Sequence, residues 1–252
     1  MIADRLARIR VLFHGQRRYD LAERALREHP ELLVDNAEAH AMLGACACKR
    51  KNFEEARSHL RKALEIDPEY ADAFYWLADA TESLSEKEAL VREAIRLRSD
   101  AAEYHAFLAQ VLLSRNKSSK ALLEIEKALS IDPNNIYCLH VKAEILIHCK
   151  KKSEAIVALN RALLINPLDA HTHVLLYSAK ARTLPRDAEQ HLKTAMQLAP
   201  NNLGDMKYCL AVRARRAEVA TIWFIVKCFL GVCIFTILID VIQRFGLWII
   251  NK

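Results

Sequence analysis

The residue types that could hold a metal ion or act as a nucleophile occur in this chain, but their spacing does not suit that chemistry. Cys46 and Cys48 are two residues apart, and so are His171 and His173. On a helix, residues two apart point to different sides, so neither pair can hold one metal ion. The sequence contains no glycine-rich phosphate loop and no Gly-x-Ser-x-Gly turn. We therefore expect no catalytic site, no metal site and no cofactor, and predict that the chain is not an enzyme.

The cysteines indicate a reducing compartment. The chain has 7 of them at irregular spacing, and an odd number does not fit a closed disulfide framework. In proteins that stay reduced, free cysteines are usually packed as small hydrophobic side chains. This favours a region that faces the cytoplasm.

Composition favours an all-helical chain with a substantial core. Of the 252 residues, 52% are hydrophobic, and only 5 are Gly and 6 are Pro. Those numbers are too small for a turn-rich all-β protein or for a disordered chain. The formal net charge is +6, well short of a nucleic-acid-binding basic tail.

A pattern of small residues recurs along the chain and predicts pairs of helices. The clearest copy covers residues 37–70, with Gly44, Ala56 and Ala63 before Pro68. The same spacing returns at Ala109, Ala121, Ala128 and Pro133, at Ala143, Ala155, Ala162 and Pro167, and at Ala188, Ala195 and Pro200. A shortened copy lies between the first two, and a degenerate copy precedes them all.

The recurring positions have a physical reason. Two antiparallel helices pack closely only where small side chains face each other, and a second small residue lets the next pair approach. The proline then ends the second helix, because it lacks an N–H and disfavours helix in the residue before it. No pair buries its apolar face alone, so the pairs must stack.

This arrangement resembles the tetratricopeptide repeat, a helix-turn-helix unit with a period of about 34 residues. The resemblance covers residues 3–202, about six repeats. It implies an all-α fold, a right-handed superhelical solenoid, over residues 1–202. Beyond it we expect a capping and juxtamembrane helix at residues 203–218, a transmembrane helix at residues 219–242, and a short tail at residues 243–252.

In that family the first helices of the repeats line a concave groove that binds a segment of another protein. The residues at the equivalent repeat positions of this chain would form a polar, aromatic and locally acidic surface. The residues expected to form this groove are Asp72, Tyr75, Asp79, Glu82, Glu103, Tyr137, His140 and Glu144. Family members that hold chaperone C-terminal carboxylates use Lys and Asn at such offsets, and this chain lacks that set. The alternative is an acidic face that contacts only solvent.

Basic residues gather at the turns within the helix pairs, which lie along one edge of such a solenoid. Anionic lipids attract Lys and Arg, so we expect this edge to face a membrane. Its residues are Lys150, Lys151, Lys152, Arg182, Arg186, Arg213, Arg215 and Arg216. The alternative is local, because basic residues also stabilise helix C-termini by opposing the helix dipole.

A long apolar run predicts a membrane anchor. Residues 219–239 contain one charged residue, Lys227, and are numerous enough to cross about 30 Å of hydrocarbon. Trp223 and Trp248 bracket the run, as aromatic residues do at membrane interfaces. More basic residues precede the run than follow it, so we expect a single-pass protein with cytoplasmic repeats and the tail on the far side. The alternative is a buried helix that closes the solenoid.

The sequence thus predicts a membrane-anchored scaffold or adaptor that presents its groove to a cytoplasmic protein segment. One alternative is a membrane-surface factor that docks nucleic acid or ribosomes through its basic edge. Aromatic residues are not interleaved with those basic residues, which argues against nucleic acid as the partner. A second alternative is a small tail-anchored adaptor of the mitochondrial fission type, which has a similar layout but fewer repeats.

Overall fold

The computed structural model describes residues 2–15, 18–181 and 183–199. Every regular element within these ranges is a helix, as the composition predicts. The chain divides after Leu168 into two compact units, which are treated separately below. The described part of the second unit reaches residue 199.

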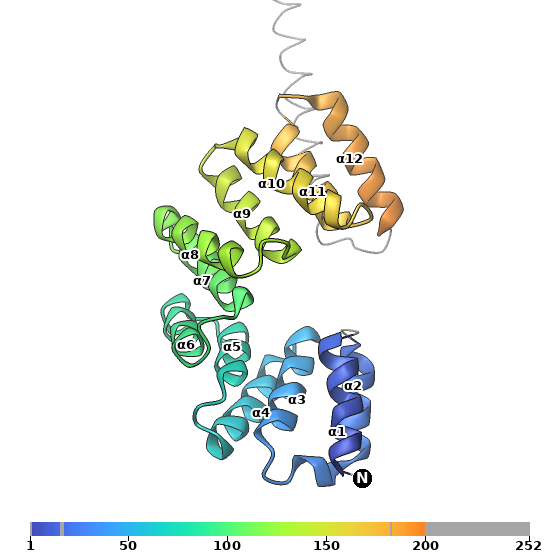
Figure 1. Ribbon diagram of the computed structural model, residues 1–252, viewed down its shortest axis with the longest axis vertical. Helices are drawn as coiled ribbons and strands as arrows, with labels where there is room; N and C mark the ends of the chain where they lie inside the picture. Colours follow the sequence, from blue (N-terminus) through green and yellow to red (C-terminus); the bar gives the residue numbers. More distant parts are fainter. Residues whose placement is uncertain (1, 16–17, 182, 200–252) are drawn as a thin grey trace, which may run out of the picture. The chain divides into compact units, whose positions relative to one another are not determined.

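The helices follow one another along the chain without intervening strands in the described ranges (Figure 1). Those of the first unit are α1 (Ile2–Arg10), a π-helical turn (Val11–Gly15), α2 (Tyr19–Glu28), a 3-10 turn (Pro30–Leu33), α3 (Ala37–Lys49), α4 (Phe53–Ile66), α5 (Ala71–Asp79), α6 (Leu84–Leu97), α7 (Ala102–Ser114), α8 (Ser118–Ile131), α9 (Ile136–His148) and α10 (Lys152–Ile165). Those described in the second unit are α11 (Ala170–Lys180) and α12 (Pro185–Leu198).

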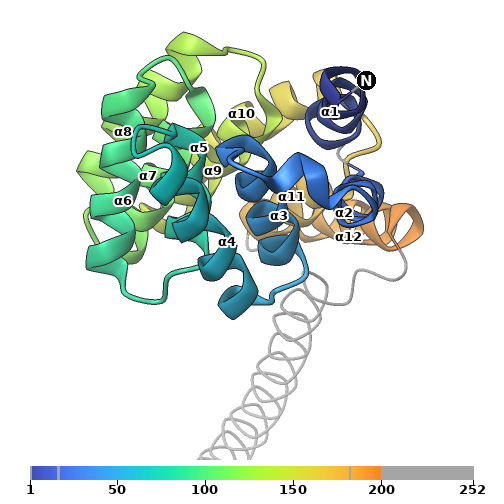
Figure 2. The same ribbon diagram turned by 90° about the horizontal axis from the view of Figure 1, so that it is seen from below.

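Consecutive helices form antiparallel pairs, which are the predicted helix-turn-helix repeats. In the first unit, α3 packs on α4, α5 on α6, α7 on α8, and α9 on α10. Figure 2 shows this pairing from a second direction. In the second unit, α11 packs on α12. Helices α1 and α2 also contact each other and form the degenerate first copy.

The pairs are held together where small residues cross. In α3, Gly44 lies so near α4 that a Cβ atom there would be 2.5 Å from Leu60 Cγ, which is too short for a real contact. Ala78, Ala109 and Ala143 occupy the corresponding place in later first helices, and all three are fully buried. The small residues of the second helices are equally buried, at Ala56, Ala121, Ala155 and Ala188. The expected packing of small residues is therefore confirmed.

At the boundaries between repeats, the side chain of the residue before proline stabilises a turn. Asp67, Asp132 and Asn166 each accept a hydrogen bond from the backbone N–H two residues later, at 3.0, 3.1 and 3.1 Å. Such Asx turns stabilise a chain reversal at the point where proline stops the helix. These side chains therefore have a structural role at the boundaries, independent of any partner.

A histidine recurs at one position of the first helices and faces the second helix of its pair. His40 Nδ1 lies 3.2 Å from His59 Nδ1, so one ring must donate and the other accept. His105 Nδ1 lies 2.8 Å from a carboxylate oxygen of Glu124. Burial lowers the pKa of both His40 and His59, and the charges of His59 and Lys62 lower that of His40 further.

The expected localisation as a single-pass membrane protein is corrected by the structure. No helix among the described residues is both long enough and apolar enough to cross a membrane. The longest of them have 14 residues, whereas a span needs about 20. The predicted capping helix 203–218, span 219–242 and tail 243–252 lie outside the described residues.

The buried crossing at Ala121 gives a test of the repeat packing. Ala121→Leu forces a larger side chain against α7, so we expect it to destabilise the fold by about 1–3 kcal/mol. The neighbouring Lys120 is exposed, and Lys120→Leu should change stability by less than about 0.5 kcal/mol. Chemical denaturation followed by circular dichroism measures both. Equal shifts in the two variants would mean that Ala121 does not lie at a helix crossing.

The contact between His40 and His59 predicts an acid-sensitive fold. Because folding lowers both pKa values, the stabilisation is fully present above the unfolded pKa of about 6.5 and is lost as the pH falls through the folded values. We expect the free energy of unfolding to fall between about pH 7.5 and 5.5, and to fall less in His59→Gln. His148→Gln removes an exposed histidine and is the control. The same pH dependence in both variants would contradict this assignment.

Candidate functional site: an aromatic groove in the first unit

An aromatic cluster connects the first helices of neighbouring repeats. Tyr75 of α5 stacks on Tyr104 of α7, with ring centroids 5.1 Å apart and planes inclined by 23°. Phe107 and Trp76 meet the Tyr75 ring edge-on, with centroids 5.3 and 5.0 Å away. Stacked and edge-to-face pairs stabilise a fold beyond the area that they bury. They hold the Tyr75 ring in place between α5 and α7.

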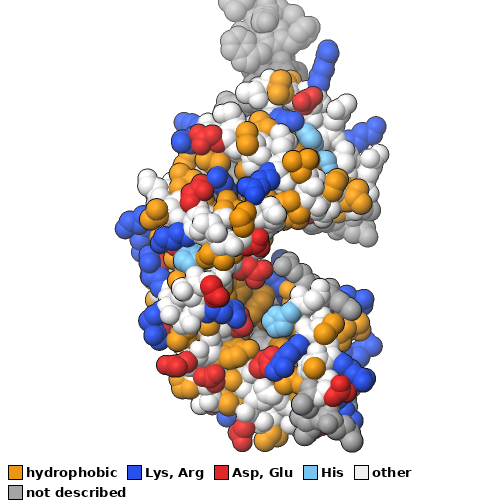
Figure 3. Space-filling model, viewed as in Figure 1, with side chains coloured by type: hydrophobic (Ala, Val, Ile, Leu, Met, Phe, Trp, Pro, Cys, Tyr) orange, Lys and Arg blue, Asp and Glu red, His pale blue; other side chains and the backbone are white. Residues whose placement is uncertain are grey.

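Hollows with shared walls follow one another along this cluster. One of about 230 Å³ is lined by Tyr19, Lys49, Tyr75, Trp76, Asp79, Glu103, Phe107, Gln110 and Tyr137. A hollow of about 110 Å³ shares Tyr75 and Glu103 with it and reaches Asp72. Another of about 260 Å³ shares Phe107 and Gln110 and reaches Glu144. Together they form one groove, called the aromatic groove below. Figure 3 shows acidic and hydrophobic side chains close together on the surface of the first unit.

Carboxylates lie beside the tyrosine hydroxyls of the aromatic groove. Burial raises the pKa of Tyr75 well above its usual value, and Tyr137, Glu103 and Asp79 raise it further. The pKa of Tyr137 is also raised, first by burial and then by Glu144, with the same two carboxylates among the smaller causes. Both hydroxyls therefore stay protonated at neutral pH, and that of Tyr137 donates a hydrogen bond to Gln110 Oε1 at 2.7 Å.

Two cations of the chain lie on aromatic rings of the groove. The Lys49 ammonium is 4.8 Å from the centroid of the Trp76 ring. The Arg98 guanidinium carbon is 4.7 Å from the centroid of the Tyr104 ring, and this guanidinium also forms an ion pair with Asp72. The Tyr104 hydroxyl donates a further hydrogen bond to Asp72. Asp72 thus holds its own helix to the next repeat.

The structure brings most of the predicted groove residues together. Those that line the aromatic groove are Asp72, Tyr75, Asp79, Glu103, Tyr137 and Glu144. Glu82 lies elsewhere, because α5 ends at Asp79 and Glu82 is exposed in the connection to α6. His140 is only 8% exposed, since residues 138–141 of α9 are all buried. Both residues lie outside the hollows that form the groove.

Sequence reasoning finds Tyr75 and Tyr137 but misses other aromatic residues that line the groove, namely Trp76, Tyr104 and Phe107. Phe107 is four residues after Glu103 and therefore on the same helix face, a signal that could identify it. Trp76 and Tyr104 directly follow predicted groove residues, so helical spacing alone assigns them to another side. Lys49 is the last residue of α3, next to a turn, yet its long side chain reaches back over Trp76, as an aliphatic stem allows.

The residues of the predicted basic edge that the structure describes do not share one environment. Lys150 has φ of 63°, the left-handed conformation that ends α9 at its turn. Lys151 Nζ lies 3.3 Å from a carboxylate oxygen of Glu154, and Lys152 begins α10. Arg186 is exposed in the second unit. Arg182, Arg213, Arg215 and Arg216 lie outside the described residues. Turn geometry and a local ion pair therefore account for Lys150 and Lys151.

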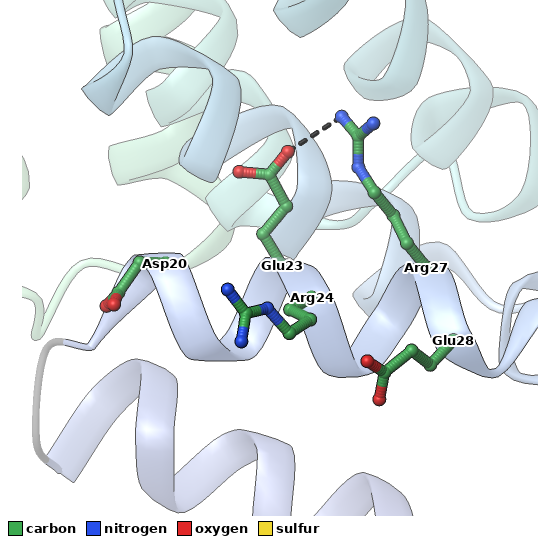
Figure 4. A pocket seen from close by; sticks show the side chains of 5 residues that line it. All are labelled: Asp20, Glu23, Arg24, Arg27 and Glu28. Carbon is green, nitrogen blue, oxygen red and sulfur yellow. Dashed lines mark ion pairs between the residues drawn. The ribbon is translucent and has the colours of Figure 1, made fainter.

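A separate hollow lies on α2. It measures about 370 Å³ and is lined by Asp20, Glu23, Arg24, Arg27 and Glu28. Figure 4 shows that all of these side chains come from one helix and that Glu23 pairs with Arg27, at 2.7 Å. Because charged side chains of both signs lie together on one face of α2 and pair with each other, this hollow is an ordinary solvated surface.

The described residues of the first unit offer few groups suited to metal or thiol chemistry. Among the residues that the structure describes, no group of three or more side chains could hold a metal ion. Burial raises the pKa of Cys46, Cys48 and Cys138 to about 12, so these thiols stay protonated and weakly nucleophilic. The aromatic groove is lined by aromatic rings, carboxylates and the Gln110 amide, which are groups that can contact a ligand.

Comparison with known families matches the tetratricopeptide repeat over residues 37–70. Subunit 3 of the anaphase-promoting complex, or cyclosome, matches over residues 80–162. Comparison with curated proteins finds no match.

Solved structures with the same fold are more numerous. A thermophilic TPR protein of Thermus thermophilus has a TM-score of 0.60 and 22% identity, and the match covers 71% of this chain and 98% of that one. The pilF protein of Pseudomonas aeruginosa has a TM-score of 0.59 and 21% identity, and the match covers 82% of this chain and 97% of that one. Yeast Tom70 has a TM-score of 0.57 and 20% identity, and the match covers 78% of this chain and 44% of that one. Identities this low establish a shared fold and leave the partners of this chain open. The repeat match over residues 37–70, the helix pairs and the buried small residues together show a tetratricopeptide repeat within a solenoid-like helical fold.

Proposed function

We propose that this chain is a protein-interaction scaffold whose aromatic groove holds an extended segment of a partner protein. Tetratricopeptide repeats generally mediate protein–protein interactions. The single observation that carries the proposal is the series of hollows with shared walls along α5, α7 and α9. These hollows combine aromatic surface with polar groups, which is the composition of protein-binding sites.

The shape of the groove favours a segment over a compact small molecule. The hollows measure about 110, 230 and 260 Å³, each below the size of about 300 Å³ at which small-molecule pockets begin. They follow one another along the helices. An extended chain places alternate side chains on one side, about 7 Å apart, and can fill successive hollows.

Docking of nucleic acid through the basic turns is the less favoured function. Arg115 and Lys117, at the turn between α7 and α8, both pair with Glu88. Arg50, at the turn between α3 and α4, pairs with Glu23 and Glu55. These carboxylates offset the positive charge that phosphate binding requires.

Selection of peptides tests the proposed function. The full chain is used to select binders from a library of random displayed segments, and the selected peptides are measured by fluorescence anisotropy. We expect Phe107→Ala to weaken their binding by roughly tenfold to thirtyfold, because Phe107 lines two of the hollows and buried aromatic residues dominate such interfaces.

The matched control is Leu123→Ala, which shortens a side chain that is 60% exposed on α8. Binding of the selected peptides should not change in this variant, and circular dichroism should show that both variants are folded. An equal loss in the two variants, or a library without any binder, would contradict a binding site in the aromatic groove.

A further inference from the structure

We propose that the aromatic groove recognises an uncharged, proline-rich segment in the polyproline II conformation. The proline rings would pack on the aromatic rings of the groove. The backbone carbonyl groups would accept hydrogen bonds from side chains of the central hollow, the one of about 230 Å³. This inference rests on the proposed function and specifies the composition of the partner segment.

Uncharged hydrogen-bond donors line the central hollow without partners of their own. They are the Tyr75 hydroxyl, the Trp76 indole N–H and the Gln110 amide nitrogen. Among the described residues, none of these three donors makes a hydrogen bond within the chain. Each reaches the surface of the groove, because none of the three atoms is buried without a hydrogen bond. The central hollow therefore favours a ligand that supplies acceptors.

Two of these donors are held in place before any ligand binds. The amide oxygen of Gln110 accepts a hydrogen bond from the Tyr137 hydroxyl at 2.7 Å, which fixes the amide plane and leaves its nitrogen free to donate. The Tyr75 ring is held by stacking on Tyr104 and by the edge-on contact with Phe107. Donors that are already ordered lose less entropy when a ligand binds.

The charges of the central hollow favour an uncharged ligand. Its charged lining residues are Asp79, Glu103 and Lys49. Glu103 already interacts with another group of the chain, and the charges of Asp79 and Lys49 are equal and opposite. Because these charges balance, the hollow attracts neither a basic nor an acidic segment strongly.

Proline supplies acceptors without adding donors. Other residues bring one backbone N–H with every carbonyl group, and each N–H that loses water needs an acceptor. The uncharged side-chain acceptor of the central hollow, Gln110 Oε1, is already bonded to Tyr137. Proline has no N–H, and a polyproline II segment leaves its carbonyl groups without internal hydrogen bonds. Such segments also dock in aromatic-lined grooves with little loss of entropy, because their conformation is formed beforehand.

The test compares two uncharged peptides of equal length, decaproline and a peptide of alternating Gly and Ser, both amidated and carrying the same fluorescent label. Binding to the full chain is measured by fluorescence anisotropy. We expect decaproline to bind more tightly than the Gly-Ser peptide. The difference should persist in added salt, because salt screens only interactions between charges. A Gly-Ser peptide that binds as tightly as decaproline would overturn the inference.

A variant without one donor tests the hydrogen bonds. Tyr75→Phe removes the hydroxyl and keeps the ring, so it should lower the affinity for decaproline about threefold to tenfold, the range for one hydrogen bond. Tyr70→Phe removes a hydroxyl from a side chain that packs against the core of α3, α4 and α5, outside the groove, and should leave the affinity unchanged. Circular dichroism checks that both variants are folded. Equal losses in the two variants would contradict the assignment of the donors.

The selected peptides separate this inference from the proposed function. If segments selected from the random library bind the groove but are not enriched in proline, the inference fails and segment binding stands. If neither decaproline nor any selected segment binds, the proposed function itself fails.

Discussion

The close crossing of paired helices is the constraint on which the rest of the structure depends. At Gly44, even a Cβ atom would lie 2.5 Å from Leu60 Cγ, so the two helices could not approach as they do with a larger residue. Alanines with no exposed surface repeat this crossing in later pairs. Because each pair has one apolar face to bury, neighbouring pairs must stack. Stacking aligns the first helices and leaves one side of each for other side chains.

The aromatic groove follows from that alignment. Tyr75 and Tyr104 come from adjacent first helices, and their stacking both joins the repeats and supplies a ring surface to the groove. Asp72 is tied to Arg98 of its own repeat, so its main role is to hold the fold. Asp79 and Glu103 lie next to the rings in the central hollow. The groove is therefore built in part from side chains that also stabilise the solenoid.

The sequence is sufficient to predict the helix pairs, their spacing and most of the groove, because small residues, prolines and helical periodicity act through the backbone. It fails where the backbone departs from the period, as at Glu82, which follows the short helix α5. It also fails where a side chain reaches across a turn, as Lys49 does over Trp76. His140 fits the expected spacing but is buried, because α9 is covered on more than one side. The expected membrane localisation has to be corrected, since no described helix could span a bilayer.

The most direct measurement of the central claim is fluorine NMR of the full chain labelled with fluorotyrosine. Tyr75 and Tyr137 line the aromatic groove, whereas Tyr177 is buried in the second unit. Single Tyr→Phe variants assign the three resonances. If the groove holds the partner segment, addition of a selected peptide shifts the resonances of Tyr75 and Tyr137 and leaves that of Tyr177 unchanged. Saturating peptide that leaves the Tyr75 and Tyr137 resonances in place would show that the segment binds somewhere else.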